Sequence, residues 1–276
     1  MRTIFATIAD RYDVITVLLS YGQDRRWKRR LIDLASPRPG ARALDLATGT
    51  GDIAFALAAR GARVVGLDIT FRMIELAREK VAHGSDKMAH GSDKVAHGSD
   101  KMAHGSDKVA HGSDKVAHGS DKVAHGLKPC DRSPEPAAPQ TPGFLVGDML
   151  ALPFPTGSFD IVTTGYGLRN VPDLAAAIDE IHRVLTPGGQ LLSLDFNRPS
   201  NRVVRSAYLA YLTVVGAALG WMLHRNTDTY RYIPASIRQY PGAAAVARSL
   251  EARGFTGVRC YPVLGGLMTI HHAIRT

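Results

Sequence analysis

The chain has 276 residues, two of them cysteines, and its 34 Lys and Arg against 25 Asp and Glu give a formal net charge of +9. This length suits one domain with a full hydrophobic core. The distance between Cys130 and Cys260, and the prolines around Cys130, exclude a disulfide framework or a zinc knuckle. The amino-terminal segment lacks the continuous apolar core of a secretory signal, so we expect a cytoplasmic protein. The positive charge suits nucleic acid, an acidic substrate or an anionic membrane and does not choose among them.

In chain order, the predicted elements alternate between strand and helix outside one insertion, which indicates a parallel sheet flanked by helices. Apolar runs of strand length lie at residues 41–47, 62–69, 144–149, 159–167 and 190–196. Segments with helical periodicity lie at residues 52–61, 71–80 and 174–185. We therefore predict an α/β fold of Rossmann-like type with a five-stranded, mostly parallel sheet and helices on both faces.

Residues 81–126 form a tandem array of six [V/M]AHGSDK units followed by VAHG. The Gly and Ser of each unit would weaken a helix at every turn, which argues against a coiled coil. The seven histidines of the array could bind transition metals, but near-identical copies are typical of a recent duplication and offer no fixed site geometry. A proline-rich segment continues the linker to residue 143. We expect one domain over residues 1–276, interrupted at 81–143 by a disordered insertion, and no metal site.

A long apolar segment at residues 203–223 has the length of a membrane span. Arg205, two tyrosines and two glycines within it weaken that interpretation. We prefer a helical lid over a substrate pocket to a buried core helix, and either of these to a true span.

A glycine-rich turn follows the first predicted strand, where Asp45 precedes Gly49, Thr50 and Gly51. Small residues at the start of a helix let a ligand approach the backbone closely. The spacing also fits the dinucleotide fingerprint, but dinucleotide folds usually carry an apolar residue where Asp45 stands. Asp68 ends the next strand and can accept hydrogen bonds from both hydroxyls of a ribose, as in NAD enzymes and methyltransferases alike.

Several further motifs resemble the C-methyltransferase family of menaquinone and ubiquinone biosynthesis. They are IADRYD at 8–13, RWKR at 26–29, GDM at 147–149, GLRNV at 167–171, RVLTPGGQLL at 183–192 and YIPASIRQYPG at 232–242. Because the motifs are independent and in the right order, the resemblance covers nearly the whole chain outside the repeat array. It implies a class I S-adenosylmethionine-dependent methyltransferase that methylates a ring carbon of a prenylated quinol, either demethylmenaquinol or a related benzoquinol.

The resemblance also implies which residues contact S-adenosylmethionine, among them Thr50, Asp68, Asp148 and Met149. Gly165 stands where the family often has a small polar residue, so a side-chain contact would be lost there. Together with the glycine-rich turn, the predicted cofactor-binding residues are Asp45, Gly49, Thr50, Gly51, Asp68, Asp148, Met149 and Gly165.

Arg169, Asn170 and Asp195 are the predicted catalytic residues, because they follow the fourth and fifth strands, and ligands bind at the carboxyl ends of strands in open α/β sheets. Arg169, placed at the mouth of the site, suits the stabilisation of a quinol oxyanion, but a guanidinium stays protonated in proteins and is a poor base. Asp195, where the resembling family usually has Glu, is either a loop anchor or a polar group that faces the substrate.

Thr16, Val17 and Asp24 depart from the Asn, Asp and His of the resembling family. These departures leave open a methyltransferase for another apolar small molecule, such as a sterol or polyketide, or a homologue that binds S-adenosylmethionine without catalysis. The expected partner is a prenylated quinol and not nucleic acid. A homodimer and a peripheral contact with the inner face of the membrane, through the basic cluster at residues 25–30, remain open.

We predict that deleting Val81 to Gly126 leaves the melting temperature and methyl transfer almost unchanged. The reason is that loop-closure entropy changes slowly with loop length, and the array offers little core. Thermal melting and a methyl-transfer assay check this, and a large fall in melting temperature would show that the repeats are structural.

Overall fold

The computed structural model describes residues 2–20, 22–83, 140–199 and 201–276. Residues 1–81 and 138–276 together make one compact unit. The predictions for the repeat array and for most of the proline-rich linker fall outside the described residues. Helical structure continues to residue 83 before this gap. Because Val81 packs against the core, a deletion that tests the repeats should begin after residue 83.

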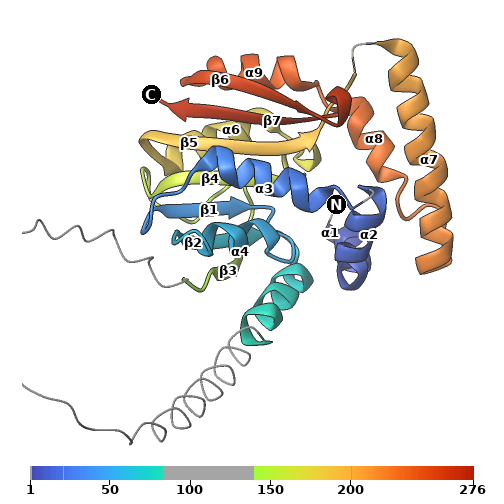
Figure 1. The fold of residues 1–276 in the computed structure, drawn as a ribbon, viewed down its shortest axis with the longest axis horizontal. Coiled ribbons are helices and arrows are strands. Elements are labelled where there is room, and N and C mark those ends of the chain that lie inside the picture. The colour runs from blue at the N-terminus through green and yellow to red at the C-terminus, as the bar shows by residue number, and fades with distance from the viewer. Residues whose placement is uncertain (1, 21, 84–139, 200) are drawn as a thin grey trace, which may run out of the picture. The chain divides into compact units, whose positions relative to one another are not determined.

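A seven-stranded sheet forms the centre of this unit, with the strand order β3-β2-β1-β4-β5-β7-β6 (Figure 1). The strands are β1 Arg42–Leu46, β2 Arg63–Asp68, β3 Gly143–Val146, β4 Phe159–Gly165, β5 Leu185–Phe196, β6 Phe255–Val263 and β7 Met268–Arg275. The first five are parallel, whereas β7 runs antiparallel to both β5 and β6. The predicted Rossmann-like, mostly parallel fold is confirmed.

The prediction of five strands is wrong, because β6 and β7 complete the sheet at one edge. Their sequences carry weak strand signals: β6 contains Pro262 and is mostly exposed, and β7 contains His271 and His272. His271 is nevertheless buried, and its ring nitrogen Nε2 lies 3.0 Å from the carbonyl oxygen of Ala243. Packing against the rest of the fold thus makes this segment a strand, although its composition does not predict one.

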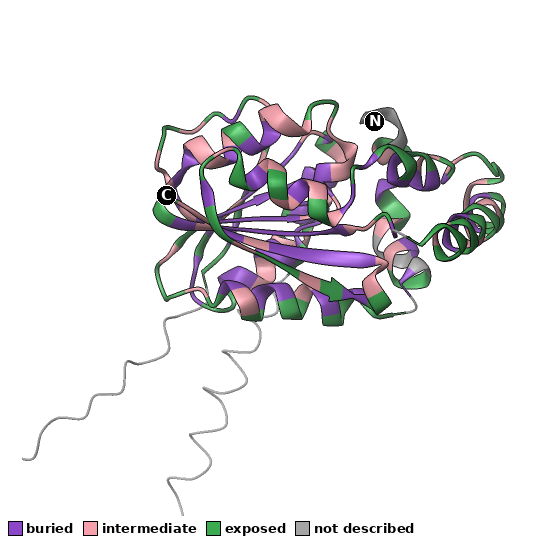
Figure 2. Cartoon of the chain, turned by 90° about the horizontal axis from the view of Figure 1, so that it is seen from above, coloured by how far each residue is buried: buried purple, intermediate pink, exposed green. Residues whose placement is uncertain are grey.

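Helices cover both faces of the sheet, and Figure 2 shows that the strands in the middle consist largely of buried residues, drawn in purple. The helices are α1 Arg2–Ile8, α2 Tyr12–Leu19, α3 Asp24–Ala35, α4 Asp52–Ala58, α6 Leu174–Val184, α7 Arg202–His224, α8 Tyr232–Gln239 and α9 Ala243–Glu251, with a further helix over residues 71–83. On one face α3, α4 and the 71–83 helix pack through residues such as Leu31, Leu57 and Ile74. On the other, α6 and α9 pack through Ile178 and Leu250.

A third apolar cluster lies beyond the carboxyl ends of the parallel strands, where α1, α2, α7 and α8 gather (Figure 1). Ile8 and Ile15 from the amino-terminal helices meet Tyr208 and Leu212 of α7 and Ile237 of α8. The segment expected to be a lid is therefore one continuous helix, α7, capped by Asn201, whose side chain accepts hydrogen bonds from two backbone N–H groups. This cluster places a helical layer over the edge at which a ligand would bind.

Candidate active site

A cavity of about 570 Å³ opens at the carboxyl ends of β1, β2, β3 and β4, and we call it the strand-end cavity. Ala47 and Gly49 line it from the turn after β1, and Asp68 lines it from the end of β2. Asp148 and Met149 contribute from the segment after β3. Ala47 has a φ of 50°, a left-handed conformation that a non-glycine residue adopts rarely and that is commonest at functional sites.

Asp68 is held in one orientation at the floor of this cavity. Its Oδ2 accepts a hydrogen bond from the Gly49 backbone N–H at 3.0 Å, and its Oδ1 accepts one from the Thr70 N–H at 2.8 Å. Burial raises the pKa of Asp68, although these backbone hydrogen bonds oppose the shift. The carboxylate ties the turn after β1 to the end of β2 and still lines the cavity, so it is pre-organised to accept hydroxyl groups of a ligand.

Five of the eight predicted cofactor-binding residues line the strand-end cavity, and they come from all four strand ends. They are Gly49, Asp68, Asp148, Met149 and Gly165. The other three, Asp45, Thr50 and Gly51, do not line it. The structure therefore brings the two sequence-distant acids, Asp68 and Asp148, to one cavity and leaves part of the glycine-rich turn beneath it.

Asp45 lies under the turn as an internal brace. It is 1% exposed, and its carboxylate accepts hydrogen bonds from the hydroxyls of Thr48 at 2.6 Å and Thr163 at 2.8 Å. Burial raises the pKa of Asp45 to about 6, against the effect of both hydroxyls. Thr50 is buried beside it in a small polar pocket, and Gly51, at a φ of 90°, begins α4.

Two glycines line the strand-end cavity where the backbone is closely packed: Gly165 ends β4, and Gly167 follows it. A Cβ on Gly167 would lie 2.5 Å from Thr164 Oγ1 and 2.8 Å from Ala47 Cβ, so no larger residue fits without a shift. A Cβ on Gly165 would lie 2.8 Å from Ile53 Cδ1. A side chain at position 165 would press on α4, which explains why glycine is tolerated where a small polar residue was expected.

A second cavity of about 530 Å³ lies among α1, α2, α7 and the segment that joins β6 to β7, and we call it the helical cavity. Its lining is largely apolar and includes Ile8, Ile15, Leu212 and Leu267. Trp27 of α3 closes part of its inner end. A cavity of this size and composition suits a hydrocarbon group better than a charged one.

The two cavities share a wall of six residues, which are Phe5, Tyr12, Tyr166, Arg169, Asn170 and Tyr232. Each of these residues lines both cavities, so a group that occupies one cavity meets a group in the other at this wall. Apart from Phe5, all carry polar atoms. The shared wall is thus the place where polar chemistry can act on an otherwise apolar ligand.

Arg169 lies buried in the shared wall, not at the mouth of the site, with its side chain only 4% exposed. Its Nε lies 3.1 Å from Asp195 Oδ1, and its Nη1 donates to Ser236 Oγ at 2.6 Å and to Asn170 Oδ1 at 3.3 Å. The guanidinium also lies 4.7 Å from the centre of the Phe196 ring, a cation–π distance. These contacts fix the direction of the positive charge.

The three predicted catalytic residues differ in whether they line the cavities. Arg169 and Asn170 line both cavities, whereas Asp195 lines neither. Asp195 accepts hydrogen bonds from the Arg169 and Phe196 backbone N–H groups at 3.1 and 2.8 Å. Burial raises the pKa of Asp195 to about 6, and the charge of Arg169 opposes that shift. Of the two roles considered for Asp195, the geometry favours that of an anchor for Arg169.

The sequence reasoning missed the tyrosines of the shared wall, Tyr12, Tyr166 and Tyr232. Tyr12 and Tyr232 lie within the IADRYD and YIPASIRQYPG motifs, and Tyr166 directly precedes GLRNV. The signal was therefore present, but a tyrosine in a motif does not reveal which way its ring points.

Comparison with known proteins agrees with this arrangement. The model of the ubiE/COQ5 methyltransferase family matches residues 1–90 and 94–275. The chain belongs to this family. It is 35% identical over 97% of its length to a demethylmenaquinone methyltransferase of Thermus thermophilus, 98% of which is covered. It is 31% identical, over 97% of its length, to a ubiquinone/menaquinone biosynthesis C-methyltransferase of Teredinibacter turnerae, 88% of which is covered.

Solved structures share the fold of this family member at low sequence identity. A Thermotoga maritima protein described as a SAM-dependent methyltransferase, possible histamine N-methyltransferase, superposes with a TM-score of 0.58 at 14% identity, covering 100% of this chain and 99% of that one. At this identity the likeness concerns the fold alone. The family predicted from the motifs is confirmed.

We predict that Asp68→Ala weakens the binding of S-adenosylmethionine at least tenfold, since a charge-assisted hydrogen bond is worth about 1.5 to 3 kcal/mol. Calorimetry on the folded variant measures it. Asp160→Ala is the matched control, because Asp160 also accepts a backbone N–H, that of Arg42, but lines neither cavity. Unchanged affinity in Asp68→Ala would remove this residue from the site.

Proposed function

We propose that this protein transfers the methyl group of S-adenosylmethionine to a ring carbon of a prenylated quinol. Its relatives are named as a demethylmenaquinone methyltransferase and a ubiquinone/menaquinone biosynthesis C-methyltransferase, which supports this proposal. The observation that carries the proposal is that the strand-end cavity, lined by the carboxylates of Asp68 and Asp148, meets the apolar helical cavity at one wall that contains Arg169. The strand-end cavity suits a nucleoside, and the helical cavity suits a ring with a hydrocarbon tail. A methyl group passed between them has to cross the shared wall.

The side chains that line the strand-end cavity suit the ribose and the purine of S-adenosylmethionine. Asp68 offers a fixed carboxylate for ribose hydroxyls, and Asp148 and Met149 offer one polar and one apolar side chain for a purine. The left-handed turn at Ala47 and Gly49 lets backbone approach the ligand. When bound, the cofactor supplies a methyl group already activated on a sulfonium, so the protein mainly has to align it and exclude water.

In the shared wall, Arg169 stabilises negative charge on the quinol oxygen. Its guanidinium is held by Asp195, Asn170 and Ser236 before any substrate binds, and such pre-organised charge acts without further reorganisation. Asn170 braces the same turn, because its side-chain amide donates to the Tyr166 carbonyl at 2.9 Å. Isotope-labelled methyl transfer to a demethylmenaquinol, a demethylated benzoquinol and a lipid-free phenol tests the proposal. Turnover of a quinol supports it, and turnover of none of the three overturns it.

We predict that Arg169→Ala lowers the turnover number by about 100-fold while cofactor affinity stays within about twofold, because an oxyanion is stabilised mainly in the transition state. Arg169→Lys should recover part of the loss, since an ammonium supplies charge but not the planar fork. Steady-state kinetics and calorimetry measure both. Normal turnover in Arg169→Ala, or a parallel loss of cofactor binding, would make Arg169 a scaffold residue.

We also propose that α7 places the protein on the cytoplasmic face of an anionic membrane. Among the described residues, α7 is the one helix long and apolar enough to cross a membrane, by length and composition alone. Its inner residues line the helical cavity, whereas Val203, Val214 and Trp221 on the outer side are 78%, 69% and 57% exposed. Arginines at 202, 205 and 225 lie at its two ends, and α7 contains no acidic residue. An apolar stripe flanked by arginines is typical of a helix that lies in the membrane surface.

The basic cluster at residues 25–30 contributes less to membrane binding than its sequence suggests. Lys28 is turned inward, 2.6 Å from Asp24 and 2.9 Å from Asp52, and is unavailable to lipid. The outer face of α7 is the better candidate, because it also covers the cavity that would take the prenyl tail.

We predict that Val214→Glu weakens binding to phosphatidylglycerol vesicles about tenfold or more, since it puts a negative charge into the apolar stripe. Val146→Glu, the same change at an exposed valine on β3, should leave binding unchanged. Vesicle sedimentation, with phosphatidylcholine as the neutral lipid, measures it. Equal binding by both variants would exclude α7. Loss of a dimer in Val214→Glu would instead assign this face to a second copy of the chain.

A further inference from the structure

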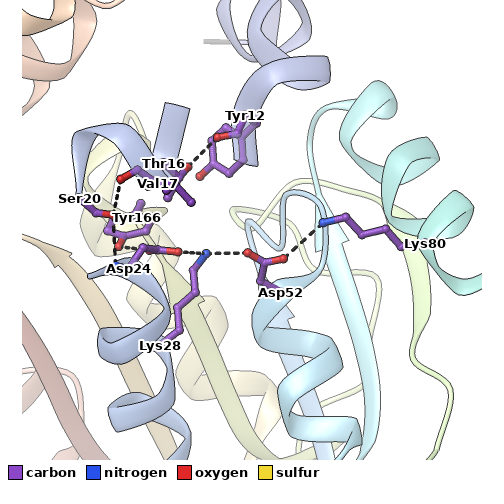
Figure 3. A network of polar contacts seen from close by, with 9 residues as sticks. All are labelled: Tyr12, Thr16, Val17, Ser20, Asp24, Lys28, Asp52, Lys80 and Tyr166. Atoms are coloured by element: carbon purple, nitrogen blue, oxygen red, sulfur yellow. Dashed lines mark hydrogen bonds and ion pairs between the residues drawn. The ribbon is translucent and has the colours of Figure 1, made fainter. Parts of the chain in front are cut away.

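A chain of polar contacts leads away from the shared wall toward the protein surface (Figure 3). The Tyr166 hydroxyl donates to Asp24 Oδ1 at 2.6 Å. The Lys28 ammonium lies 2.6 Å from Asp24 Oδ2 and 2.9 Å from Asp52 Oδ2, and Lys80 lies 3.3 Å from the other oxygen of Asp52. Four separate segments of the chain supply these residues: α3, the end of β4, α4 and the 71–83 helix.

Tyr166 is fixed in an unusual conformation at the inner end of this chain. Its φ is 62°, and left-handed backbone at a bulky residue costs about 1 to 3 kcal/mol. The Tyr166 N–H donates to the Leu194 carbonyl at 2.7 Å, and its ring packs 5.6 Å from that of Phe196. The turn therefore aims the phenol at Asp24 while the ring lines both cavities.

Methylation of a quinol carbon releases one proton, and the residues described so far do not accept it. A guanidinium such as that of Arg169 is a poor base, and Asp195 lines neither cavity. Among the described tyrosines of the shared wall, Tyr166 is the one whose hydroxyl donates to a carboxylate. A phenol in this position can accept a proton on its oxygen only while it gives its own proton to that carboxylate.

We propose that Tyr166 accepts the hydroxyl proton of the quinol as it passes its own proton to Asp24. This inference rests on the proposed function. It names Tyr166 as a catalytic residue and Asp24 as a positioning residue that acts through it. Burial and the nearby charge of Asp24 raise the pKa of Tyr166 far above its usual value, so the phenol stays neutral between turnovers and serves only to pass protons.

The step balances in atoms and charge. The O–H bond of the quinol breaks, a bond forms from its proton to Tyr166 Oη, and the former Tyr166 proton bonds to Asp24 Oδ1. The electron pair left on the quinol oxygen moves into the ring, and the ring carbon forms its bond to the methyl group as the carbon–sulfur bond breaks. The ketone so formed loses the proton of the methylated carbon and regains its hydroxyl, so that one proton leaves in total.

Asp24 also connects Tyr166 to a groove from which the proton can reach solvent. Together with Lys28 and Asp52 it lines a third cavity, an outer groove rich in charged side chains that borders the helical cavity at Thr16. Burial lowers the pKa of Lys28, but the charges of Asp52 and Asp24 outweigh it and raise that pKa, so Lys28 stays charged. Its ammonium balances the two carboxylates and holds Asp24 toward Tyr166 whether or not substrate is present.

The test compares Tyr166→Phe and Asp24→Asn with Tyr230→Phe in the full-length protein. Tyr230 is the matched control, because its hydroxyl also makes one part-buried hydrogen bond, at 2.9 Å to His224, and Tyr230 lines neither of the two main cavities. We expect Tyr166→Phe and Asp24→Asn to lower kcat about 100-fold, the usual scale of general base catalysis. KM for the quinol and the Kd of S-adenosylhomocysteine should stay within about twofold. Asp24→Glu should restore part of kcat.

The pH profile separates a proton relay from a structural role. In Asp24→Asn the residual rate should rise about tenfold per pH unit above neutrality, because only quinol that is already ionised then reacts. A structural defect would lower the rate by the same factor at every pH. Melting temperatures close to that of Tyr230→Phe would show that the variants are folded. Should Asp24→Asn fail to fold, Tyr166→Phe gives the same readouts.

Wild-type kcat in Tyr166→Phe, or a loss that is equal at every pH, overturns the relay while the proposed function stands. A wild-type protein that methylates no quinol overturns the proposed function and the relay with it. A selective fall in kcat with the altered pH profile supports both.

Discussion

The buried ion pair between Arg169 and Asp195 is the constraint on which the rest of the site depends. Taking two charges out of water costs several kcal/mol per ion, so the pair persists only where other hydrogen bonds complete it. Here the Arg169 and Phe196 backbone N–H groups donate to the carboxylate, and Arg169 Nη1 donates to Ser236 and Asn170. The pair joins the end of β5 to the turn after β4 and to α8. It therefore fixes the wall between the two cavities as a single rigid piece.

That wall explains how one fold can treat two chemically different ligands. The strand ends supply backbone N–H groups and carboxylates, which is where open α/β sheets bind nucleotides. The helices beyond them supply an apolar cavity that the sheet could not form. Methyl transfer to carbon needs both ligands in contact and water excluded, because carbon is a weak nucleophile. The helical layer over the sheet edge, built from α1, α2, α7 and α8, meets both needs.

The sequence predicted which residues line the strand-end cavity better than which line the shared wall. Asp68 was singled out as the end of a strand and Asp148 through the resemblance of the GDM motif, and both line that cavity. Asp45 was singled out with the glycine-rich turn, but strand residues alternate between faces and its carboxylate is turned inward to Thr48 and Thr163. The hydrogen bond between Tyr166 and Asp24 joins residues 142 positions apart in the sequence, and no local sequence pattern predicts such a contact. β6 and β7 pair with each other locally, but Pro262 in β6 and the two histidines in β7 weaken their strand signals, and the pairing of β7 with β5 is distant in sequence.

The departures from the family pattern at positions 16, 17 and 24 look unrelated along the chain, yet in space they gather at one place (Figure 3). The Thr16 hydroxyl donates to the Tyr12 carbonyl at 2.9 Å. Thr16, Val17 and Asp24 all line the outer groove, and Thr16 also lines the helical cavity. In the strand-end cavity the corresponding departure is Gly165 alone. The residues that differ thus surround the route by which a proton would leave, whereas those that would hold the cofactor are kept. For Asp24 to receive the proton of the quinol it needs a partner that reaches the ring, because its own side chain lies outside both cavities. Tyr166, forced into a left-handed turn and bonded to that carboxylate, has the position and the chemistry to be that partner.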